Sequence, residues 1–370
     1  MDEKVFNILK KDLESELEYI IKNHCIDVDT TLNSEKLKKS IAEINKFEIL
    51  HNNPPIICCA AYLGSEKCFS TLIKLNANVE CIDFYHTPLT FFAVVGNSAK
   101  ILDNLLNISK NSKYNLSFHN SIFCALEYHS FNDQSNDFEL AGWLYSYNFF
   151  KSTDVDFRGY SLVRCAIEFN RVEYLRFFIE VAKCQLTNSA NLFMKCQESS
   201  FSPLCYAFEK KSYDCLNYIL NVSISKSQYS QSYTSLQSIM YNQNKIIIDI
   251  NQCDENRNSV IHYAAQYGDV DIVQKILNFD DVLVSTRNLQ GKTPLELAAN
   301  EKIASLISER AEKNRKLEET MQKEQIRIQN EKKLAEEKKS HSQIIPGQNC
   351  KKIVSDNMMA KNASTACILI

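Results

Sequence analysis

An internal repeat constrains the fold of this chain more than any other sequence feature. In most copies, a Ser, Thr or Pro is followed by a small residue five places later. The same Ser, Thr or Pro is followed by Gly, Asn or Lys nine places later. The clearest copies are TPLTFFAVVG from Thr87, SVIHYAAQYG from Ser259 and TPLELAANEK from Thr293. Weaker copies begin at Pro55, Asn120, Ser161 and Ser202, so the intervals are 32, 33, 41, 41, 57 and 34 residues. A period of this length indicates a repeat architecture.

Each copy has the local chemistry of two short helices joined by a turn. Ser or Thr before a helix accepts a hydrogen bond from a free backbone N–H, and Pro is tolerated in the first helical turn. The small residue lies where neighbouring helices approach, and Gly tolerates positive φ at the expected turn near Gly268. A second helix follows, with apolar residues at helical spacing, as in Val270, Ile272, Val273 and Ile276. One such pair cannot bury its own apolar face, so the copies are expected to stack.

These stretches resemble the ankyrin repeat family. Its T-P-L-H-x-A signature is matched by Thr87-Pro88-Leu89, by Thr293-Pro294-Leu295 and by Ser259-Val-Ile-His262-Tyr-Ala264. The family's Asp-x-x-Gly turn is matched by Asp156-Phe-Arg-Gly159, Asp254-Glu-Asn-Arg257 and Asn288-Leu-Gln-Gly291. The resemblance implies an all-α solenoid of about seven degenerate helix–turn–helix repeats over residues 53–308. It also implies that His262 ties its turn by hydrogen bonds.

The resemblance further implies a protein partner on the concave surface of the stack. In this family the turn tips and the residues before the inter-helix turn make the contacts. The corresponding residues here are Phe157, Arg158, Tyr160, Glu168, Phe169, Glu255, Asn256, Asn258, Gln266, Tyr267, Leu289, Gln290 and Lys292. Aromatic and Arg side chains often anchor interfaces. An aromatic residue such as Phe169 can instead pack only against the neighbouring repeat.

The segment 1–52 has two helical apolar stripes, one through Val5, Ile8 and Leu9 and another through Leu37 and Ile41. A solenoid needs an end with a polar outer face, so this segment is expected to be an N-terminal helical cap. An independent helical module is the alternative. The longest insertion spans 221–250, and its residues 221–245 are rich in Ser, Gln, Tyr and Asn. We expect a loop there, because such a composition buries little apolar surface.

Residues 309–341 are dense in Glu, Lys, Arg and Gln and lack Gly and Pro. They predict one long charged helix, supported by pairs such as Glu312 with Lys316. Ile307, Met321, Ile328 and Ala335 share a seven-residue spacing, but most partner positions are polar. A solvated helix is therefore favoured over a dimerising coiled coil, and a monomer is expected.

Residues 342–370 are expected to be a disordered tail ending in Cys367-Ile-Leu-Ile. This ending has the C-a-a-X form that prenyltransferases read, so Cys367 is a candidate lipidation site. One lipid anchors weakly, and Cys350 or nearby lysines would have to assist. A prenylated, membrane-tethered adaptor is thus an alternative to an untethered one.

Composition excludes several other functions. The net charge is −3, so no basic field suggests nucleic acid as a partner. The 14 cysteines are scattered and form no CxxC pair, which is typical of free, buried thiols in a cytoplasmic protein. The sequence contains no GxGxxG, GxxxxGK[ST], HExxH or GxSxG, and it predicts no catalytic residue, metal site or cofactor. The expected function is a non-enzymatic interaction scaffold, with an enzyme site hidden between repeats as a remote alternative.

Overall fold

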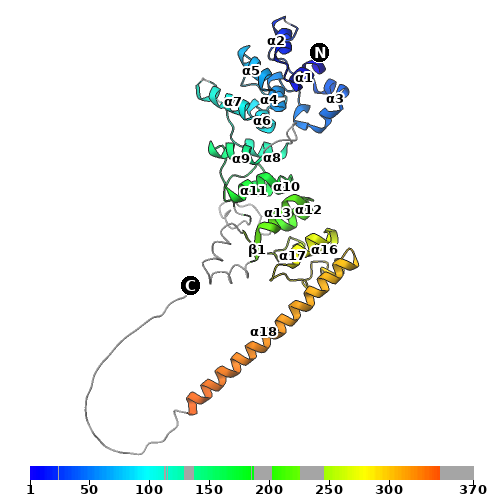
Figure 1. The fold of residues 1–370 in the computed structure, drawn as a ribbon, viewed down its shortest axis with the longest axis vertical. Coiled ribbons are helices and arrows are strands. Elements are labelled where there is room, and N and C mark those ends of the chain that lie inside the picture. The colour runs from blue at the N-terminus through cyan, green and yellow to red at the C-terminus, as the bar shows by residue number, and fades with distance from the viewer. Residues whose placement is uncertain are drawn as a thin grey trace, which may run out of the picture. The chain divides into compact units, whose positions relative to one another are not determined.

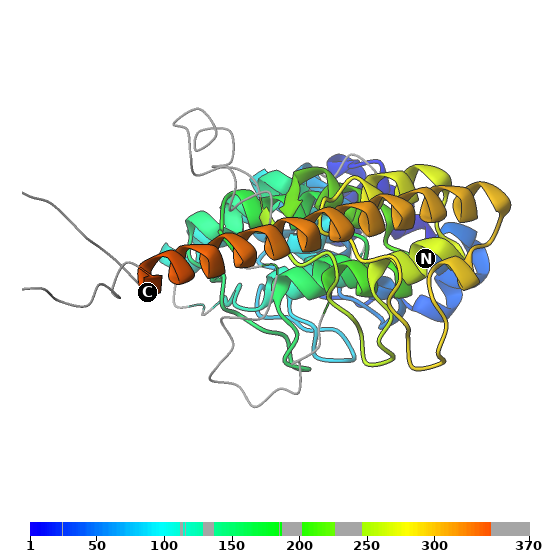
Figure 2. The same cartoon turned by 90° about the horizontal axis from the view of Figure 1, so that it is seen from below.

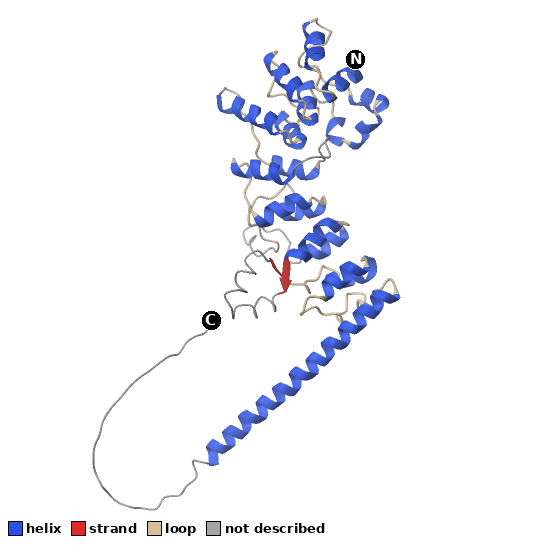
Figure 3. Cartoon of the chain, viewed as in Figure 1, coloured by secondary structure: helices blue, strands red, loops and turns tan. Residues whose placement is uncertain are grey.

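The computed structural model describes residues 1–23, 25–111, 114, 116–128, 137–184, 186, 202–225 and 246–341. It divides into two compact units, residues 1–311 and 312–370. The first unit contains the repeats and nearly all of the core (Figure 1). Its described helices are joined by loops, and its two described strands, β1 (Ser223–Ser225) and β2 (Ile246–Ile248), pair in parallel (Figure 3).

Successive helix pairs stack on one another, as the repeat predicts. The pairs are α4 (Ile56–Leu63) with α5 (Glu66–Lys74), α6 (Leu89–Gly96) with α7 (Ala99–Asn111), α8 (Ser121–Glu127) with α9 (Asp137–Ser146), α10 (Leu162–Glu168) with α11 (Val172–Glu180), α12 (Pro203–Glu209) with α13 (Tyr213–Val222), and α16 (Val260–Tyr267) with α17 (Val270–Leu277). The first helices pack in the order α4, α6, α8, α10, α12 and α16. Each pair is therefore buried by its neighbours, and the predicted all-α solenoid is confirmed.

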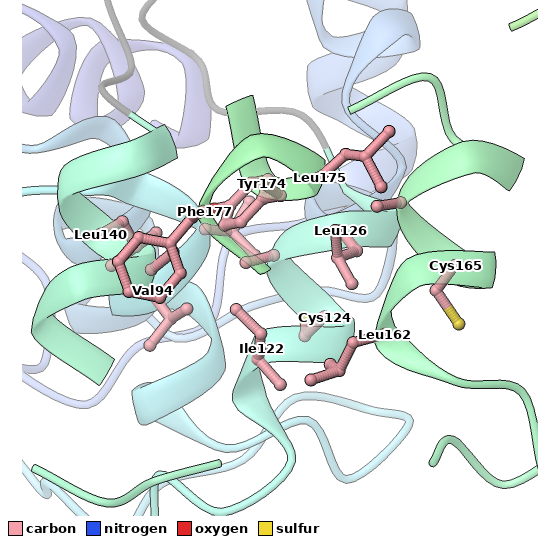
Figure 4. Packing of buried hydrophobic residues seen from close by; sticks show 14 of the residues in the cluster. Val94, Ile122, Cys124, Leu126, Leu140, Leu162, Cys165, Tyr174, Leu175 and Phe177 are labelled. Carbon is pink, nitrogen blue, oxygen red and sulfur yellow. The ribbon is translucent and has the colours of Figure 1, made fainter. Parts of the chain in front are cut away.

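The core continues from pair to pair rather than forming separate clusters. Figure 4 shows Val94 of α6, Ile122 and Leu126 of α8, and Leu162 of α10 meeting across three successive repeats. Helices of seven to thirteen residues are marginal alone in water, so this packing supplies most of their stability.

The N-terminal segment contributes a further helix pair, α1 (Asp2–Lys10) and α2 (Glu14–Lys22). The Ser65 hydroxyl donates to the Leu9 carbonyl at 2.6 Å, and Asp12 accepts from the Cys68 amide at 2.8 Å. The same two bonds recur between later repeats, where Ser212 donates to Ile167 and Asn170 accepts from Cys215. Both Asp12 and Asn170 have φ of 52°. The segment predicted as a cap therefore begins with a pair that stacks like a repeat.

An insertion follows this first pair. Thr31 and Pro55 form an antiparallel bridge, and between them lie α3 (Ser34–Ser40) and the 3-10 helices η1 (Ala42–Lys46) and η2 (Glu48–His51). Ser34 fixes this insertion, because its hydroxyl donates to the Leu50 carbonyl at 2.7 Å and accepts from the Asn53 amide at 2.9 Å.

The glycines at the inter-helix turns differ from expectation at two places. Gly268 has φ of −76°, and Gly96 is the last residue of α6, where Asn97 takes φ of 53°. Gly96 is needed for packing, since a Cβ there would lie 2.2 Å from the Ala61 carbonyl oxygen of α4. At Gly64, Asn170 and Lys211 the turn residue does have positive φ.

The copy from Thr293 does not form the expected helix pair. Only a 3-10 turn, η4 (Leu295–Leu297), takes the place of its first helix, and Leu295 is 41% exposed. Thr293 and Glu296 do form reciprocal capping bonds, of 3.3 Å and 2.7 Å. No following repeat covers this segment within the described residues of the first unit, so a full helix would gain little from packing.

The charged helix, α18 (Glu301–His341), begins eight residues before the predicted boundary at 309. Its first residues belong to the first unit, where Ile303 and Ile307 are buried and Arg310 donates to the Phe279 and Asp280 carbonyls. In the second unit it carries ion pairs at helical spacing, including Glu312 with Lys316. That α18 is a solvated helix rather than a dimerising coiled coil stays a prediction. The insertion from 226 to 245 and the tail 342–370 lie outside the described residues.

Candidate functional site

Four turns with one common hydrogen-bond pattern precede the first helices of their repeats. We call them fingers and name each by its first residue: Asp83, Asp156, Asp254 and Asn288. In each finger the first side chain accepts from the backbone N–H two and four residues later, at 2.7–3.0 Å. Its own N–H donates to the carbonyl four residues later. An Asp or Asn is required because its short side chain reaches its own backbone.

Positive φ closes each finger one residue after its tip. The residues are His86 (64°), Gly159 (81°), Arg257 (58°) and Gly291 (75°).

In the Asp83 finger, the helix that follows is capped at Pro88 and not at Thr87, so this copy begins one residue later than the sequence frame suggests. Counted from Asp83, Pro88 matches Ser161 in the Asp156 finger and Ser259 in the Asp254 finger.

Consecutive fingers are tied to each other. The Leu289 amide donates to the Asn256 carbonyl at 2.9 Å, and the Asn288 amide side chain donates to the Asn258 side chain at 2.9 Å. The Asp83 finger is tied to the preceding insertion in the same manner, by the Phe84 amide and the Asn52 carbonyl at 3.0 Å. The loops therefore form one edge of the stack (Figure 2).

The tips of the Asp83, Asp156 and Asn288 fingers expose large apolar side chains. The exposed fractions are 73% for Phe84, 69% for Tyr85, 95% for Phe157 and 61% for Leu289. Such side chains are costly to leave in water, and on rigid turns along one edge they are typical of a binding surface. Phe157 and Leu289 were predicted. Phe84 and Tyr85 were missed because Asp83-Phe-Tyr-His86 lacks the glycine of the expected turn, although the Asp four residues before Thr87 was a usable signal.

The predicted residues around the Asp156 finger form an ionic network. Arg158 contacts Asp156 at 2.8 Å and Glu168 at 2.9 Å, and Lys210 contacts Glu168 at 3.2 Å. The Tyr160 ring lies 4.6 Å from Arg158 and 3.6 Å from Arg164. Tyr160 and Glu168 are thus partly covered by their own neighbours, whereas Phe157 is free to make contacts.

The remaining predicted residues divide into exposed and structural ones. Glu255, Asn256, Gln266, Tyr267, Leu289, Gln290 and Lys292 are exposed. Asn258 is half-buried and bonds to Asp254 and Asn288, so it holds the fingers in place. The Gln266 amide donates to the Tyr267 hydroxyl at 2.7 Å. Their part in partner binding stays a prediction.

A groove of about 520 Å³ lies over α8, between the Asp83 and Asp156 fingers. Aromatic residues form much of its wall, with Thr87, Asn120, Glu127, Asp156 and Arg158 as polar groups; the aromatic ones are Phe91, Phe123, Tyr128, Phe157 and Phe169. Phe169 thus both packs on the core and lines an open surface. The sequence prediction missed Phe91, Phe123, Tyr128 and Glu127, since its weakest copy begins at Asn120.

The groove exists because α8 has no finger of its own. Nine residues, 112–120, join α7 to α8, whereas fourteen, 75–88, join α5 to α6. Asn120 caps α8 with φ of 64°, and the Ser117 carbonyl accepts from Thr90 at 2.8 Å, so this connection runs directly into the helix. An isolated antiparallel β-bridge precedes each of the helices α4, α6, α10 and α16. Among the described residues, no such bridge precedes α8.

The groove carries an excess of negative charge. Partial burial raises the pKa of Glu127, and the nearby carboxylates Glu48, Asp156 and Glu168 raise it further, against the opposing effect of Arg158. Burial also raises the pKa of Tyr128 to about 12, which keeps its phenol neutral. Arg158 is already paired with Asp156 and Glu168, and among the described residues no ion pair joins Glu127 to a cation.

His262 has the structural position that its repeat frame implies. Its Nδ1 lies 2.9 Å from the Ser259 hydroxyl and accepts from the Ser259 amide at 3.1 Å, which makes a capping box. Its Nε2 lies 3.2 Å from the Thr286 carbonyl of the next finger strand. Burial lowers the pKa of this histidine, so the neutral ring joins two repeats.

Within the described part of the chain, His, Cys, Asp and Glu form no group that could hold a metal ion. No helix described here is long and apolar enough to cross a bilayer. Cys367, the candidate lipidation site, lies outside the described residues and stays a prediction.

Comparison with known proteins agrees with the helix pairs and fingers. The family model described as ankyrin repeats, in three copies, matches residues 227–316, which include the Asp254 and Asn288 fingers. The chain contains ankyrin repeats. No curated protein sequence matches it.

Two solved ankyrin repeat domains are similar at low identity. That of human ASB11 is 14% identical with a TM-score of 0.33, and covers 83% of this chain and 96% of its own. That of Bcl-3, titled a unique member of the IkappaB protein family, is 12% identical with a TM-score of 0.31, over 82% and 97%. Similarity at this level says nothing about the partners of this ankyrin repeat protein.

Proposed function

We propose that this ankyrin repeat protein is a non-enzymatic scaffold that binds a partner protein through its fingers and first helices. Ankyrin repeat domains are generally protein-interaction modules and are typically non-catalytic. The observation that carries the proposal is the set of exposed apolar tips on three fingers, each held by an Asp or Asn side chain.

Rigidity supports the assignment of the fingers as the binding face. Each tip is fixed by two bonds to its first side chain, and the Asn288 finger is bonded to the Asp254 finger. A partner that docks on these tips therefore pays little for ordering them, which favours affinity. Aromatic tips such as Phe84, Tyr85 and Phe157 supply large contact areas.

An enzyme site between repeats has less support. The buried thiols have raised pKa values because they are desolvated, as for Cys124 and Cys165, and a protonated thiol is a poor nucleophile. The buried His262 is engaged in a helix cap rather than facing the groove.

The test is affinity capture with the full chain, comparing the natural sequence with the double variant Phe157→Ser/Leu289→Ser. Each substitution removes an exposed tip without touching the core, so the fold stays and partner recovery falls at least tenfold. The matched control is Leu317→Ser/Met321→Ser, which removes two apolar side chains, each 56% exposed, from the second unit. Equal recovery by all three proteins, with unchanged thermal unfolding, would refute the proposal.

A further inference from the structure

The groove over α8 lies where the described part of the stack lacks a finger, and this position indicates what kind of ligand fits it. The Asp83 and Asp156 fingers flank it, and the repeat between them supplies only α8 as a floor. Between the Asp254 and Asn288 fingers, which belong to consecutive repeats, direct hydrogen bonds close this space. A segment from another molecule can therefore occupy a place that the described part of the chain leaves open.

The flanking fingers present backbone groups that their counterparts use for pairing. Leu289, one residue after Asn288, donates its N–H to the carbonyl of Asn256, two residues after Asp254. The equivalent groups at the gap are the N–H of Phe157 and the carbonyl of Tyr85. Within the described chain neither group has a backbone hydrogen bond. In the described chain one donor and one acceptor thus lack the backbone partner that a consecutive finger provides.

The size of the gap fits a short extended segment. Packed helices lie about 8–10 Å apart, so fingers two repeats apart are separated by about 16–20 Å. An extended chain rises about 3.3 Å per residue, and five or six residues span that distance. The two free backbone groups would meet opposite ends of such a segment.

The walls of the groove select a cationic side chain for the middle of that segment. In the part of the chain that the structure describes, Glu127 forms no ion pair, and Glu48, Asp156 and Glu168 add to its negative field. The aromatic wall suits the same charge, because a cation is attracted to a ring face. Arg158 illustrates this chemistry within the chain: its guanidinium lies 5.6 Å from the Phe157 ring and pairs with Asp156.

We propose that the groove over α8 binds an extended segment of a partner protein, about six residues long, with a central lysine or arginine beside Glu127. This inference rests on the proposed function, since it names the chemistry that one part of the finger edge recognises. The segment takes the place of the missing finger, with its backbone bonded to Phe157 and Tyr85 and its cation over the aromatic wall.

A displayed library of random twelve-residue peptides, selected against the full chain, tests the proposal. We expect enriched peptides to share one Lys or Arg within a segment of about six residues. The affinity of a synthetic copy, measured by fluorescence anisotropy, should fall about tenfold for Glu127→Gln and stay unchanged for Asp271→Asn, an exposed acid on the second helix α17. Replacing the peptide cation with Met should weaken binding to the natural chain tenfold and barely affect binding to Glu127→Gln.

The backbone bonds have their own readout. N-methylation at successive positions of the synthetic peptide should weaken binding strongly at the one residue that donates to Tyr85, and less at outward-facing residues.

Other outcomes overturn the inference. Peptides without a shared cation, peptides equally bound by Glu127→Gln, or no enriched peptide at all would each exclude a cation-selective groove for a linear segment. Enriched peptides that lose affinity with Leu289→Ser but not with Glu127→Gln would also overturn it, while leaving the proposed function intact.

Discussion

At the scale of single residues, the first side chain of each finger matters most for its shape. Asp254 accepts from the Asn256 amide at 2.9 Å, the Asn258 amide at 2.7 Å and the Tyr263 hydroxyl at 2.6 Å. Asn288 has the same role in the next finger with a neutral amide. The carbonyl oxygen of the side chain, rather than its charge, is therefore the essential group.

We expect Asp254→Ala to lower the unfolding free energy by about 2–3 kcal/mol, because it removes three hydrogen bonds at once. Asp254→Asn should cost about 1 kcal/mol, since an amide oxygen still accepts the two backbone bonds. The measurement is urea unfolding followed by circular dichroism. Glu255→Ala, at the exposed neighbouring position, is the control and should change stability by less than about 0.5 kcal/mol. An Asp254→Ala value within that same range would contradict the account.

The lowered pKa of His262 predicts how the free energy of unfolding depends on pH. Burial lowers its pKa in the folded chain, with the Asp254 carboxylate acting in the opposite direction. The unfolded chain therefore takes up a proton below about pH 6.5 that the folded chain does not, and stability falls as the pH drops through this range. The loss continues down to the folded pKa, with a slope of at most about 1.4 kcal/mol per pH unit for one group.

The variant His262→Gln isolates this contribution, because Gln at the same position can still complete the capping box. Between pH 7.5 and 5.5 the natural chain should lose more stability than the variant, as measured by urea unfolding at each pH. Parallel losses in the two proteins would show that His262 does not carry the effect.

At the scale of elements, the sequence predicted most helix pairs because each copy contains its own cap, small residue and apolar stripe. Ser161, Ser202 and Ser259 all begin a first helix, as expected. The prediction was wrong at Thr293, whose first helix depends on a covering repeat that no local signal reports. The pairing of α1 with α2 was also missed, because Asp12 replaces the usual turn residue and the insertion with α3 hides the period.

Helix packing distinguishes two glycines that look alike in the sequence. A Cβ on Gly96 would meet the Ala61 and Tyr62 backbone at 2.2–2.8 Å, whereas one on Gly142, in α9, would meet only the Phe177 ring at 3.5 Å. We expect Gly96→Ala to destabilise the chain by about 3 kcal/mol or more, since α4 and α6 would have to separate. Gly142→Ala should be neutral or stabilise by up to about 1 kcal/mol through helix propensity.

Thermal and urea unfolding of the two variants provides this comparison. Similar stabilities for Gly96→Ala and Gly142→Ala would contradict the close approach of α6 to α4.

At the scale of the whole molecule, the first unit gains its stability from neighbour contacts along the stack. The α1–α2 pair covers α4 and α5, with Leu9 and Leu17 fully buried and Asp12 bonded to the start of α5. The candidate site depends on the same order of repeats. Its tips and its groove come from four fingers and one missing finger, so the sequence could predict Phe157 and Leu289 singly but not the gap over α8.

We expect deletion of residues 1–52 to expose the apolar faces of α4 and α5 and to lower stability. Hydrogen exchange followed by mass spectrometry should show faster exchange in α4 and α5 and little change in α16 and α17. Unchanged protection in α4 and α5 would instead indicate that the N-terminal segment is an independent module.

The central claim, that the finger edge is the partner-binding face, is tested most directly by site-specific photo-crosslinking in cells that produce the protein. A photoreactive residue is placed at Phe157 or Leu289 on the tips, or at Lys74 of α5 or Arg176 of α11 on the second helices, all of which are exposed. The account predicts crosslinks to a common partner from both tip positions and from neither second-helix position. Crosslinks to that partner only from Lys74 or Arg176 would contradict it.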